Sequence, residues 1–138
     1  MTTHYTAPLA DIRFDLYDLL DVGKLFAKLP GCDGLTCETI DAVLEEAAKF
    51  SQQVLAPLNE VGDRQGCTFD KETGAVTTPE GFKHAYEQYI EGGWAGLTAP
   101  EAFGGQGLPE TIGAPVKEMV DSANLAWGTY PLLSHGAT

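Results

Sequence analysis

Basic side chains are scarce in this sequence. Eight lysine and arginine residues stand against twenty aspartates and glutamates among 138 residues, which gives a formal net charge of −12. Such a chain would be repelled by a nucleic-acid backbone and by an anionic membrane surface. The charge balance therefore argues against nucleic acid as a partner. It also argues against a chain that grips a polyphosphate cofactor by itself.

Long apolar runs and paired cysteines are also lacking. No run approaches the ~20 apolar residues that span a bilayer. The first residues show no basic region followed by an apolar core, so we expect neither a membrane span nor a secretory signal. The three cysteines, Cys32, Cys37 and Cys67, form no Cys-x-x-Cys pair. We interpret them as free thiols of a cytoplasmic protein, with a single disulfide as the alternative.

No self-contained catalytic or metal-binding pattern is present. His4, His84 and His135 lie far apart in the sequence without cysteine or carboxylate partners at ligand spacing, so we predict no metal site. Ser134 precedes His135, but a nucleophile and its base must meet in space, and no third group is suggested to orient them. The glycines of residues 104–107 match neither the dinucleotide-binding nor the P-loop pattern. We therefore assign no catalytic residue to this chain.

Apolar residues recur at helical spacing along most of the chain, which predicts an all-α fold, an irregular bundle of about five helices. We expect an N-terminal arm with short helices over residues 1–35 and a helical domain over residues 36–138. The predicted helices cover residues 11–29 with Asp11 as N-cap and a division at Gly23, residues 36–59 capped by Thr36, a segment from the Thr78-Pro79 start signal to Gly92, and residues 109–122.

Two details refine this expectation. Residues 67–77 could form a very short hairpin around an Asp70–Gly74 turn. The helix over residues 109–122 has one face that we expect to be buried, and it consists of Ile112, Val116, Met119, Val120 and Ala123.

The segment from Glu91 to Pro109 is rich in glycine. It holds six of the sixteen glycines, the tryptophan Trp94, the phenylalanine Phe103 and two prolines, so it cannot be regular structure throughout. Long glycine-rich loops inside compact domains are often functional. We predict an ordered, crowded loop, and the alternative is a mere connection between two helices.

The last residues are apolar, and no charged side chain follows Asp121. Chain ends are usually exposed and polar, so we expect these residues to be a piece of a longer protein. We also expect them to expose apolar surface at Trp127, Leu132 and Leu133 and to promote self-association. The alternative is a complete small protein whose final helix is buried in an oligomer.

The loop sequence Gly93-Trp94-Ala95-Gly96-Leu97, followed by Pro100-Glu101-Ala102-Phe103-Gly104-Gly105-Gln106-Gly107-Leu108, resembles the pattern of the acyl-CoA dehydrogenase family. The flanking segments are also similar to that family. They are Ala56-Pro57-Leu58-Asn59 at the end of the long helix, Val116-Lys117-Glu118-Met119 in the predicted helix over residues 109–122, and the small-residue stretch 124–135. The opening residues 5–16 resemble the larger bacterial branch that includes methylthiopropionyl-CoA dehydrogenase. Lys117 departs from the double acid that is common in the family at Lys117-Glu118.

The resemblance implies an N-terminal helical domain, which the family follows with a middle β-domain and a C-terminal four-helix bundle. It implies FAD as cofactor, an acyl-CoA substrate, an electron-transfer flavoprotein as partner and a homo-oligomeric enzyme. The catalytic base of the family lies in the C-terminal domain, so neither Glu101 nor Glu118 corresponds to it. The sequence matches the first domain only, which predicts that this piece alone is inactive and retains little FAD.

The resemblance also suggests a role for this chain, namely one wall of the acyl and flavin pocket. The residues that we expect in that wall are Phe103, Gly104, Gly105, Asn124, Trp127 and Tyr130. Core packing is the alternative for Trp127 and Phe103. The competing hypothesis for the whole chain is a standalone helical protein-interaction module without catalysis.

Overall fold

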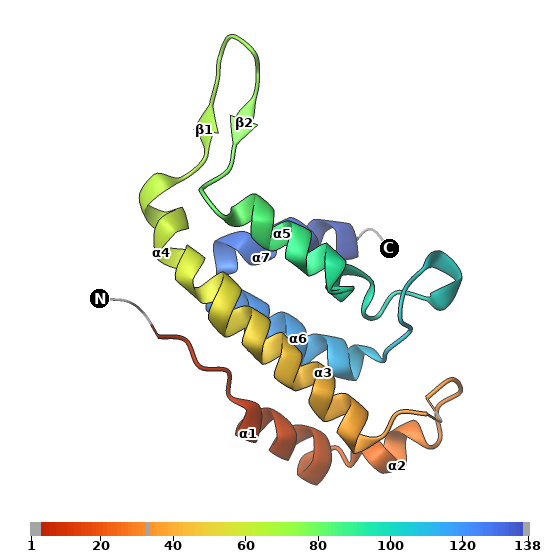
Figure 1. Cartoon of the computed structure of the whole chain (residues 1–138). Helices are drawn as coiled ribbons and strands as arrows, with labels where there is room; N and C mark the ends of the chain where they lie inside the picture. Colours follow the sequence, from red (N-terminus) through yellow and green to blue (C-terminus); the bar gives the residue numbers. More distant parts are fainter. Residues whose placement is uncertain (1–3, 33, 137–138) are drawn as a thin grey trace.

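The computed structural model describes residues 4–32 and 34–136, and these form a helical bundle with one short hairpin, so the prediction of an all-α fold is confirmed (Figure 1). The α-helical segments of the described residues are α1 (Leu9–Arg13), α2 (Val22–Phe26), α3 (Cys37–Phe50), α4 (Ala56–Gln65), α5 (Phe82–Glu91), α6 (Glu110–Ala123) and α7 (Leu125–His135). Between them lie the π-helical turns η1 (Phe14–Leu19) and η2 (Ser51–Leu55), the strands β1 (Thr68–Phe69) and β2 (Val76–Thr77), and the 3₁₀ turns η3 (Trp94–Gly96) and η4 (Glu101–Phe103).

The first helix starts earlier than the sequence predicts. α1 begins at Leu9, directly after Pro8, and the amide of Ile12 donates to the Pro8 carbonyl at 3.0 Å. Proline suits this position because its fixed φ matches the first turn of a helix. The break falls at Asp21, whose φ is 49°, and not at Gly23, which lies inside α2. The predictions of an Asp11 cap and of a division at Gly23 are therefore wrong.

The long central helix extends further than predicted. The segments α3, η2 and α4 follow one another without a break from Cys37 to Gln65, six residues beyond the predicted end at Asn59. Thr36 caps the helix as predicted, because its hydroxyl accepts from the Thr39 amide at 3.3 Å. Pro57 removes a donor and crowds the preceding turn. The chain passes Pro57 because the wider π-helical turn η2 comes directly before it.

The predicted hairpin is present, and it projects from the helical body in Figure 1. β1 and β2 pair antiparallel, with Phe69 opposite Val76. The helix that follows does not start at Thr78, as the sequence predicted, but at Phe82. Gly81 has a φ of 83°, and the Phe82 amide donates to the carbonyl of Pro79, so a turn replaces the predicted cap. α5 ends at Glu91 with Gly92 as its C-cap, so the predicted stop at Gly92 is confirmed.

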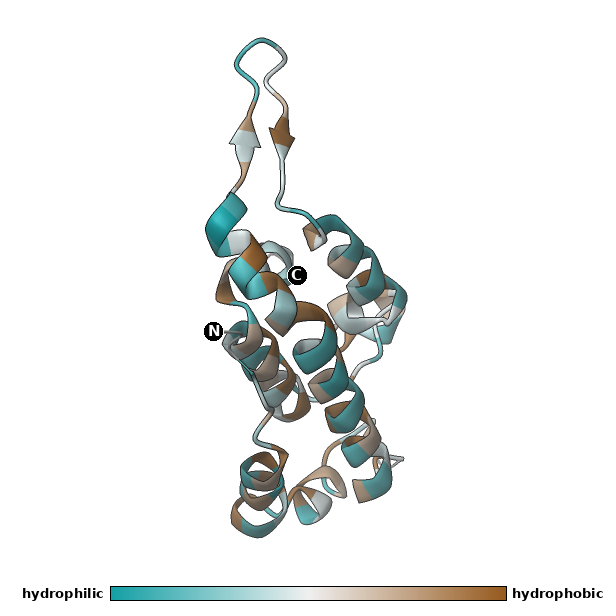
Figure 2. Cartoon of the chain, turned by 60° about the vertical axis from the view of Figure 1, so that its left-hand side comes forward, coloured by the Kyte–Doolittle hydropathy of each residue, from teal (hydrophilic) through white to brown (hydrophobic). Residues whose placement is uncertain are grey.

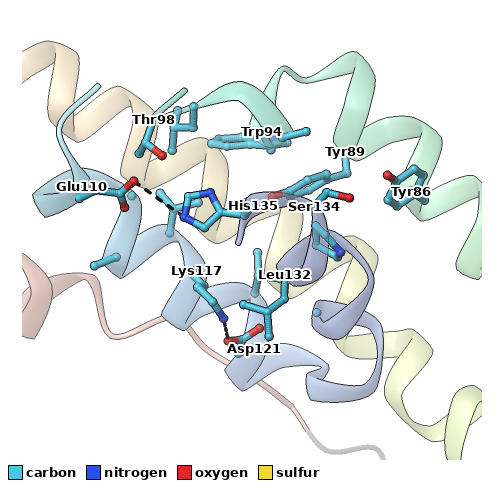
Figure 3. Close-up of a pocket in the computed structure, with 18 residues that line it drawn as sticks. Tyr86, Tyr89, Trp94, Thr98, Glu110, Lys117, Asp121, Leu132, Ser134 and His135 are labelled. Carbon is cyan, nitrogen blue, oxygen red and sulfur yellow. Dashed lines mark hydrogen bonds and ion pairs between the residues drawn. The ribbon is translucent and has the colours of Figure 1, made fainter. Parts of the chain in front are cut away.

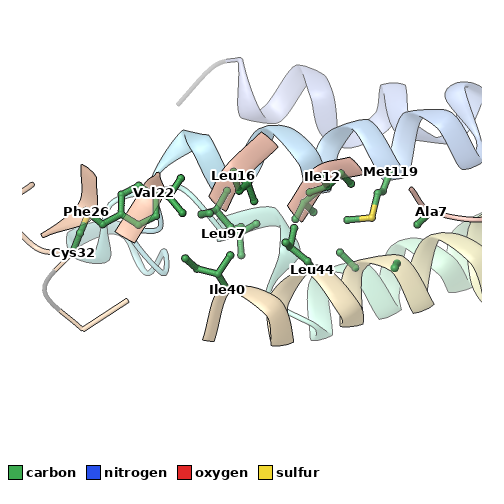
Figure 4. Packing of buried hydrophobic residues seen from close by; sticks show 14 residues of the cluster. Ala7, Ile12, Leu16, Val22, Phe26, Cys32, Ile40, Leu44, Leu97 and Met119 are labelled. Atoms are coloured by element: carbon green, nitrogen blue, oxygen red, sulfur yellow. The ribbon is translucent and has the colours of Figure 1, made fainter. Parts of the chain in front are cut away.

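Two clusters of buried side chains hold the helices together. The first joins α1, η1, α2, α3 and α6, and Figure 4 shows its members meeting between these elements. The second surrounds the fully buried Trp127. In Figure 2 the helices carry separate hydrophobic and hydrophilic stripes, as amphipathic packing requires. The buried face predicted for α6 is confirmed for all five of its residues, Ile112, Val116, Met119, Val120 and Ala123.

A polar contact fastens the N-terminal helix to α3. The guanidinium of Arg13 donates to Asp41 at 2.9 Å and to Glu45 at 2.7 Å, and the Tyr17 hydroxyl donates to Asp41 at 3.0 Å. The hydrogen bond from Arg13 lowers the pKa of the Asp41 carboxyl. Burial, and then the hydrogen bond to Asp41, raises the pKa of Tyr17. The contact is partly exposed, so it orients α1 more than it stabilises the fold.

Candidate functional site

The glycine-rich loop between α5 and α6 is ordered by its own backbone. The amide of Gln106 donates to the Gly96 carbonyl at 2.8 Å, and the amide of Leu108 donates to the Leu97 carbonyl at 3.0 Å. The Gln106 side chain reaches back to the carbonyl of Gly93 at 2.9 Å. A Cβ atom at Gly105 would overlap the carbonyl of Ala99, so no larger residue fits without a backbone shift. The loop is therefore a folded element, as the sequence predicted.

This loop closes one side of a cleft of about 280 Å³. The other sides come from α5, α6 and α7, and Figure 3 shows their side chains pointing into a common space. The lining side chains include Tyr86, Tyr89, Trp94, Leu97, Thr98, Glu110, Val116, Lys117, Val120, Asp121, Leu132, Ser134 and His135. The cleft is thus built by four consecutive segments of the chain, between Tyr86 and His135.

The interior of the cleft is largely aromatic and aliphatic. Tyr89 packs edge-on against Trp127 with ring centroids 5.4 Å apart, and Phe50 contacts both Tyr89 and Trp94. Burial raises the pKa of Tyr89 to about 12, with smaller contributions from Tyr86 and Asp121. The Tyr89 phenol is therefore neutral at physiological pH. Such a lining suits an apolar group better than a charged one.

The charged groups of the cleft are already partnered. Lys117 pairs with Asp121 one turn further along α6. His135 at the end of α7 lies 3.8 Å from Glu110 at the start of α6, measured between Nε2 and Oε1. Gly128 allows α7 to approach α6 closely, because a Cβ atom there would meet the carboxylate of Asp121. These pairs link α6 to itself and to α7, and they leave the middle of the cleft apolar.

The six residues predicted for the pocket wall lie in different surroundings. Asn124 and Trp127 are buried at the joint between α6 and α7. The side chain of Asn124 accepts from the Trp127 amide at 3.0 Å and donates to the Leu55 carbonyl at 3.2 Å, and the Trp127 indole donates to the Phe82 carbonyl at 3.2 Å. These two residues tie together three helices. The expectation of exposed surface at Trp127 is therefore wrong, whereas Leu132 and Leu133 are exposed as expected.

The remaining four wall residues are accessible to different degrees. Phe103 is 87% exposed at the end of η4, and Gly104 and Gly105 follow it in the loop. Tyr130 is 39% exposed on α7, where its hydroxyl lies 3.9 Å from the Cys67 thiol. None of the six predicted residues lines the cleft of Figure 3. Their role as a wall of an acyl and flavin pocket stays a prediction.

The sequence did not indicate that the residues lining the cleft lie close together. The pairing of Lys117 with Asp121 follows from their spacing of four on a helix, and Trp94 belongs to the loop motif. The approach of α5 to the end of α7 depends on the Asn124–Trp127 joint, which no periodicity reveals. Ser134 and His135 both line the cleft.

Within residues 4–32 and 34–136, no group of three or more histidine, cysteine or acidic side chains is placed to hold a metal ion. No helix in that same part of the chain is both long and apolar enough to cross a membrane. The three cysteines are free thiols, with Cys32 buried and the other two exposed.

Comparisons with known proteins give a consistent result. No protein-family model matches the chain. It is 38% identical to 3-methylmercaptopropionyl-CoA dehydrogenase of Ruegeria pomeroyi over 96% of the chain, and 33% identical to a butyryl-CoA dehydrogenase of Syntrophomonas wolfei over 97%. It is 29% identical over 93% to the broad-specificity linear acyl-CoA dehydrogenase FadE5 of Mycobacterium tuberculosis.

The share of each relative that is matched is much smaller. The chain covers 22%, 22% and 21% of the length of these three proteins. The curated relatives of this chain are thus acyl-CoA dehydrogenases, as the loop motif predicted, and the chain spans about a fifth of their length.

Proposed function

We propose that this chain is the N-terminal domain of an FAD-dependent acyl-CoA dehydrogenase, an oxidoreductase that introduces an α,β double bond into an acyl-CoA thioester. The observation that carries the proposal is the 38% identity over 96% of the chain to a dehydrogenase of which the chain covers 22%. The helical fold and the ordered Gly-Trp to Gly-Gly-Gln-Gly loop support it. In this proposal residues 36–138 belong to the helical domain, and residues 1–35 form its N-terminal arm.

The cleft does not fit FAD by itself. A dinucleotide is larger than the drug-sized ligands that occupy clefts of roughly 300–1,000 Å³, and the cleft here holds about 280 Å³. Its lysine, Lys117, is engaged by Asp121 and is not placed to receive a pyrophosphate. The proposal therefore assigns flavin binding and the catalytic base to other parts of the enzyme. This chain alone is expected to be inactive.

The proposed contribution of this chain is one wall of the acyl and flavin pocket. Phe103 suits that role because its ring is exposed beside Gly104, where nothing lies within 4 Å of a Cβ position. Tyr130 is partly exposed and can contribute directly. Asn124 and Trp127 are buried, so they would act as positioning residues that hold α7 in place. An apolar wall excludes water from the acyl group, which is what the uncharged α7 offers.

Further parts of the proposal concern partners and location. The intact enzyme would pass electrons to an electron-transfer flavoprotein and assemble as a homo-oligomer. A cytoplasmic location is supported by the three free thiols. The acyl group that the enzyme prefers is left open, since the relatives differ in the substrates that their names give.

The proposal is tested with protein expressed from the complete reading frame. We expect that protein to be yellow, with stoichiometric flavin, and to reduce an artificial electron acceptor when an acyl-CoA is supplied. We expect the 138-residue chain, purified in parallel, to show neither property. A complete protein without flavin and without activity would favour the standalone interaction module. Stoichiometric flavin on the 138-residue chain would contradict the division of labour proposed above.

A further inference from the structure

The first helix of the chain, α1 continued by η1, presents apolar side chains to solvent. Phe14 is 59% exposed, Leu19 is 69% exposed and Leu20 is 51% exposed. The opposite side of the same helix is anchored, because Ile12 and Leu16 are buried in the first cluster. Figure 1 shows α1 at the lower edge of the bundle. The exposed apolar side chains therefore add nothing to the core that the described residues form.

The π-helical geometry of η1 brings these apolar side chains to one side. The amide of Leu20 donates to the carbonyl of Asp15, five residues earlier, at 2.9 Å. Residues five apart in a π-helix lie near one another, and Phe14 and Leu19 are such a pair. In an α-helix, with 3.6 residues per turn, residues five apart point to different sides. π-Helical turns are also frequent at functional sites.

Exposed carboxylates border this apolar stripe. Helical spacing places Asp11 and Asp15 along one edge of the stripe and Asp18 along the other, and all three are exposed. Within residues 4–32 and 34–136 none of the three forms an ion pair. The nearby Arg13 points to the opposite side of the helix, where it donates to two acids of α3. The resulting surface, called the acid-flanked face below, consists of Asp11, Phe14, Asp15, Asp18, Leu19 and Leu20.

We propose that the acid-flanked face docks an amphipathic helix of another protein, one whose apolar stripe is bordered by lysine and arginine. The apolar stripes of the two helices pack together along their length. The basic side chains meet the carboxylates, as charges beside the apolar seam of a coiled coil do. The inference goes beyond the proposed function and does not depend on it, because α1 and η1 do not line the cleft.

Charge favours this partner over a second copy or a membrane. A second copy that used the same face would set carboxylates against carboxylates, and like charges across an interface are unfavourable. An anionic membrane surface is repelled for the same reason. A basic helix is instead attracted at long range, because the whole chain carries a net charge of −12, and this attraction speeds their encounter.

Peptide binding to the protein from the complete reading frame tests the inference. The probe is a dye-labelled helical peptide of about 15 residues, built from leucine and lysine with its leucines on one side. Fluorescence anisotropy measures its affinity for wild type and for two variants of the acid-flanked face. One variant combines Phe14→Ser with Leu19→Ser, and the other combines Asp15→Asn with Asp18→Asn.

The hairpin provides matched controls. Phe69 and Val76 are each 63% exposed, which is close to the exposure of the two apolar residues under test, so Phe69→Ser with Val76→Ser controls for apolar surface. Glu72→Gln with Glu80→Gln, on and beside the hairpin, controls for charge because both side chains are exposed. Circular dichroism of every variant checks that the helices are retained.

We expect Phe14→Ser with Leu19→Ser to weaken binding by more than about tenfold, because two large apolar side chains leave the interface. Asp15→Asn with Asp18→Asn should weaken it about threefold at low salt and less at high salt, where charges are screened. This second variant removes no apolar contact, so it keeps the test valid if the serine variant unfolds. Both hairpin controls should stay within about twofold of wild type.

Three results would overturn the inference. Equal weakening by the face variants and the hairpin controls would show that the peptide responds only to net charge. Binding that neither face variant weakens would show that the peptide binds elsewhere. A wild-type dimer in sedimentation that Phe14→Ser with Leu19→Ser converts to monomer would assign the face to a second copy.

Discussion

Trp127 and Phe103 are two aromatic residues with the same predicted role and opposite surroundings. Trp127 is fully buried, donates to the Phe82 carbonyl and touches Phe50, Tyr86 and Tyr89. Phe103 is 87% exposed, and no aromatic partner is recorded for it among the described residues. The difference teaches that an aromatic residue near a motif can serve the fold or remain available to a ligand. Burial separates the two roles, whereas sequence does not.

The largest effect is expected from Trp127→Ala. Removing a fully buried ring leaves a cavity, and it also removes the hydrogen bond that the indole donates to the Phe82 carbonyl. We expect the free energy of unfolding to fall by about 3–5 kcal/mol, measured by urea denaturation of the intact protein. Phe103→Ala is the control, and it should change stability by less than about 0.5 kcal/mol. Equal losses of unfolding free energy from the two substitutions would contradict the assignment of Trp127 to the core and Phe103 to the surface.

Gly105→Ala should have the next largest effect. Its Cβ atom would overlap the Ala99 carbonyl, which belongs to the backbone and cannot turn aside, so the loop must shift at a cost of about 1–3 kcal/mol. Gly23→Ala provides a control inside α2, because a Cβ atom there has no neighbour within 4 Å. We expect that control to gain up to about 1 kcal/mol. Thermal unfolding of the two variants under the same conditions distinguishes these outcomes.

Asn124→Ala should weaken the joint that holds α7. It removes the cap on the Trp127 amide and the buried hydrogen bond to the Leu55 carbonyl, which costs about 1–3 kcal/mol in the free energy of unfolding. Thr36→Ala removes an exposed cap and should cost about 0.5 kcal/mol. Denaturant titrations of both variants measure the difference. A smaller loss at Asn124 than at Thr36 would show that the joint is not held by this side chain.

Asp41→Asn should have the smallest effect, and that effect should depend on pH. The hydrogen bond from Arg13 lowers the pKa of Asp41 below 3.8 in the folded protein. The stabilisation is therefore present above the unfolded-state pKa of about 4 and is lost as pH falls through the folded-state value. Because the pair is partly exposed, we expect less than about 1 kcal/mol at pH 7. Stability measured at pH 7 and pH 3 checks this, and a difference that persists unchanged at pH 3 would contradict it.

Much of the fold could be predicted because its helices and caps depend on local sequence patterns. The buried face of α6, the Thr36 cap and the stop at Gly92 depend on residues within a few positions of one another. The predicted helix boundaries were wrong where an unusual backbone conformation overrides the local helix-start or helix-end pattern. Pro8 starts a helix, the π-helical turn η2 carries the long helix past Pro57, and Asp21 adopts a positive φ.

The candidate site was harder to predict because its members meet only in the folded chain. The loop motif identified the family of the relatives and drew attention to Trp94, but it did not reveal that Tyr89, Val120 and Leu132 face the same cleft. That arrangement depends on how α7 packs against α6 and α5, and the buried hydrogen bonds of Asn124 lie at the joint between α6 and α7. Such packing between helices is not visible in a local sequence pattern.

The central claim is that this domain supplies a wall to an active site completed by other parts of the enzyme, and Phe103 offers its most direct test. The measurement is kcat/KM of Phe103→Ala in the complete enzyme over acyl-CoA substrates of increasing chain length. Because this substitution should leave stability unchanged, we predict a shift in the relative preference among the substrates, with flavin content unaltered. An identical preference in wild type and Phe103→Ala would contradict the claim that this loop borders the pocket.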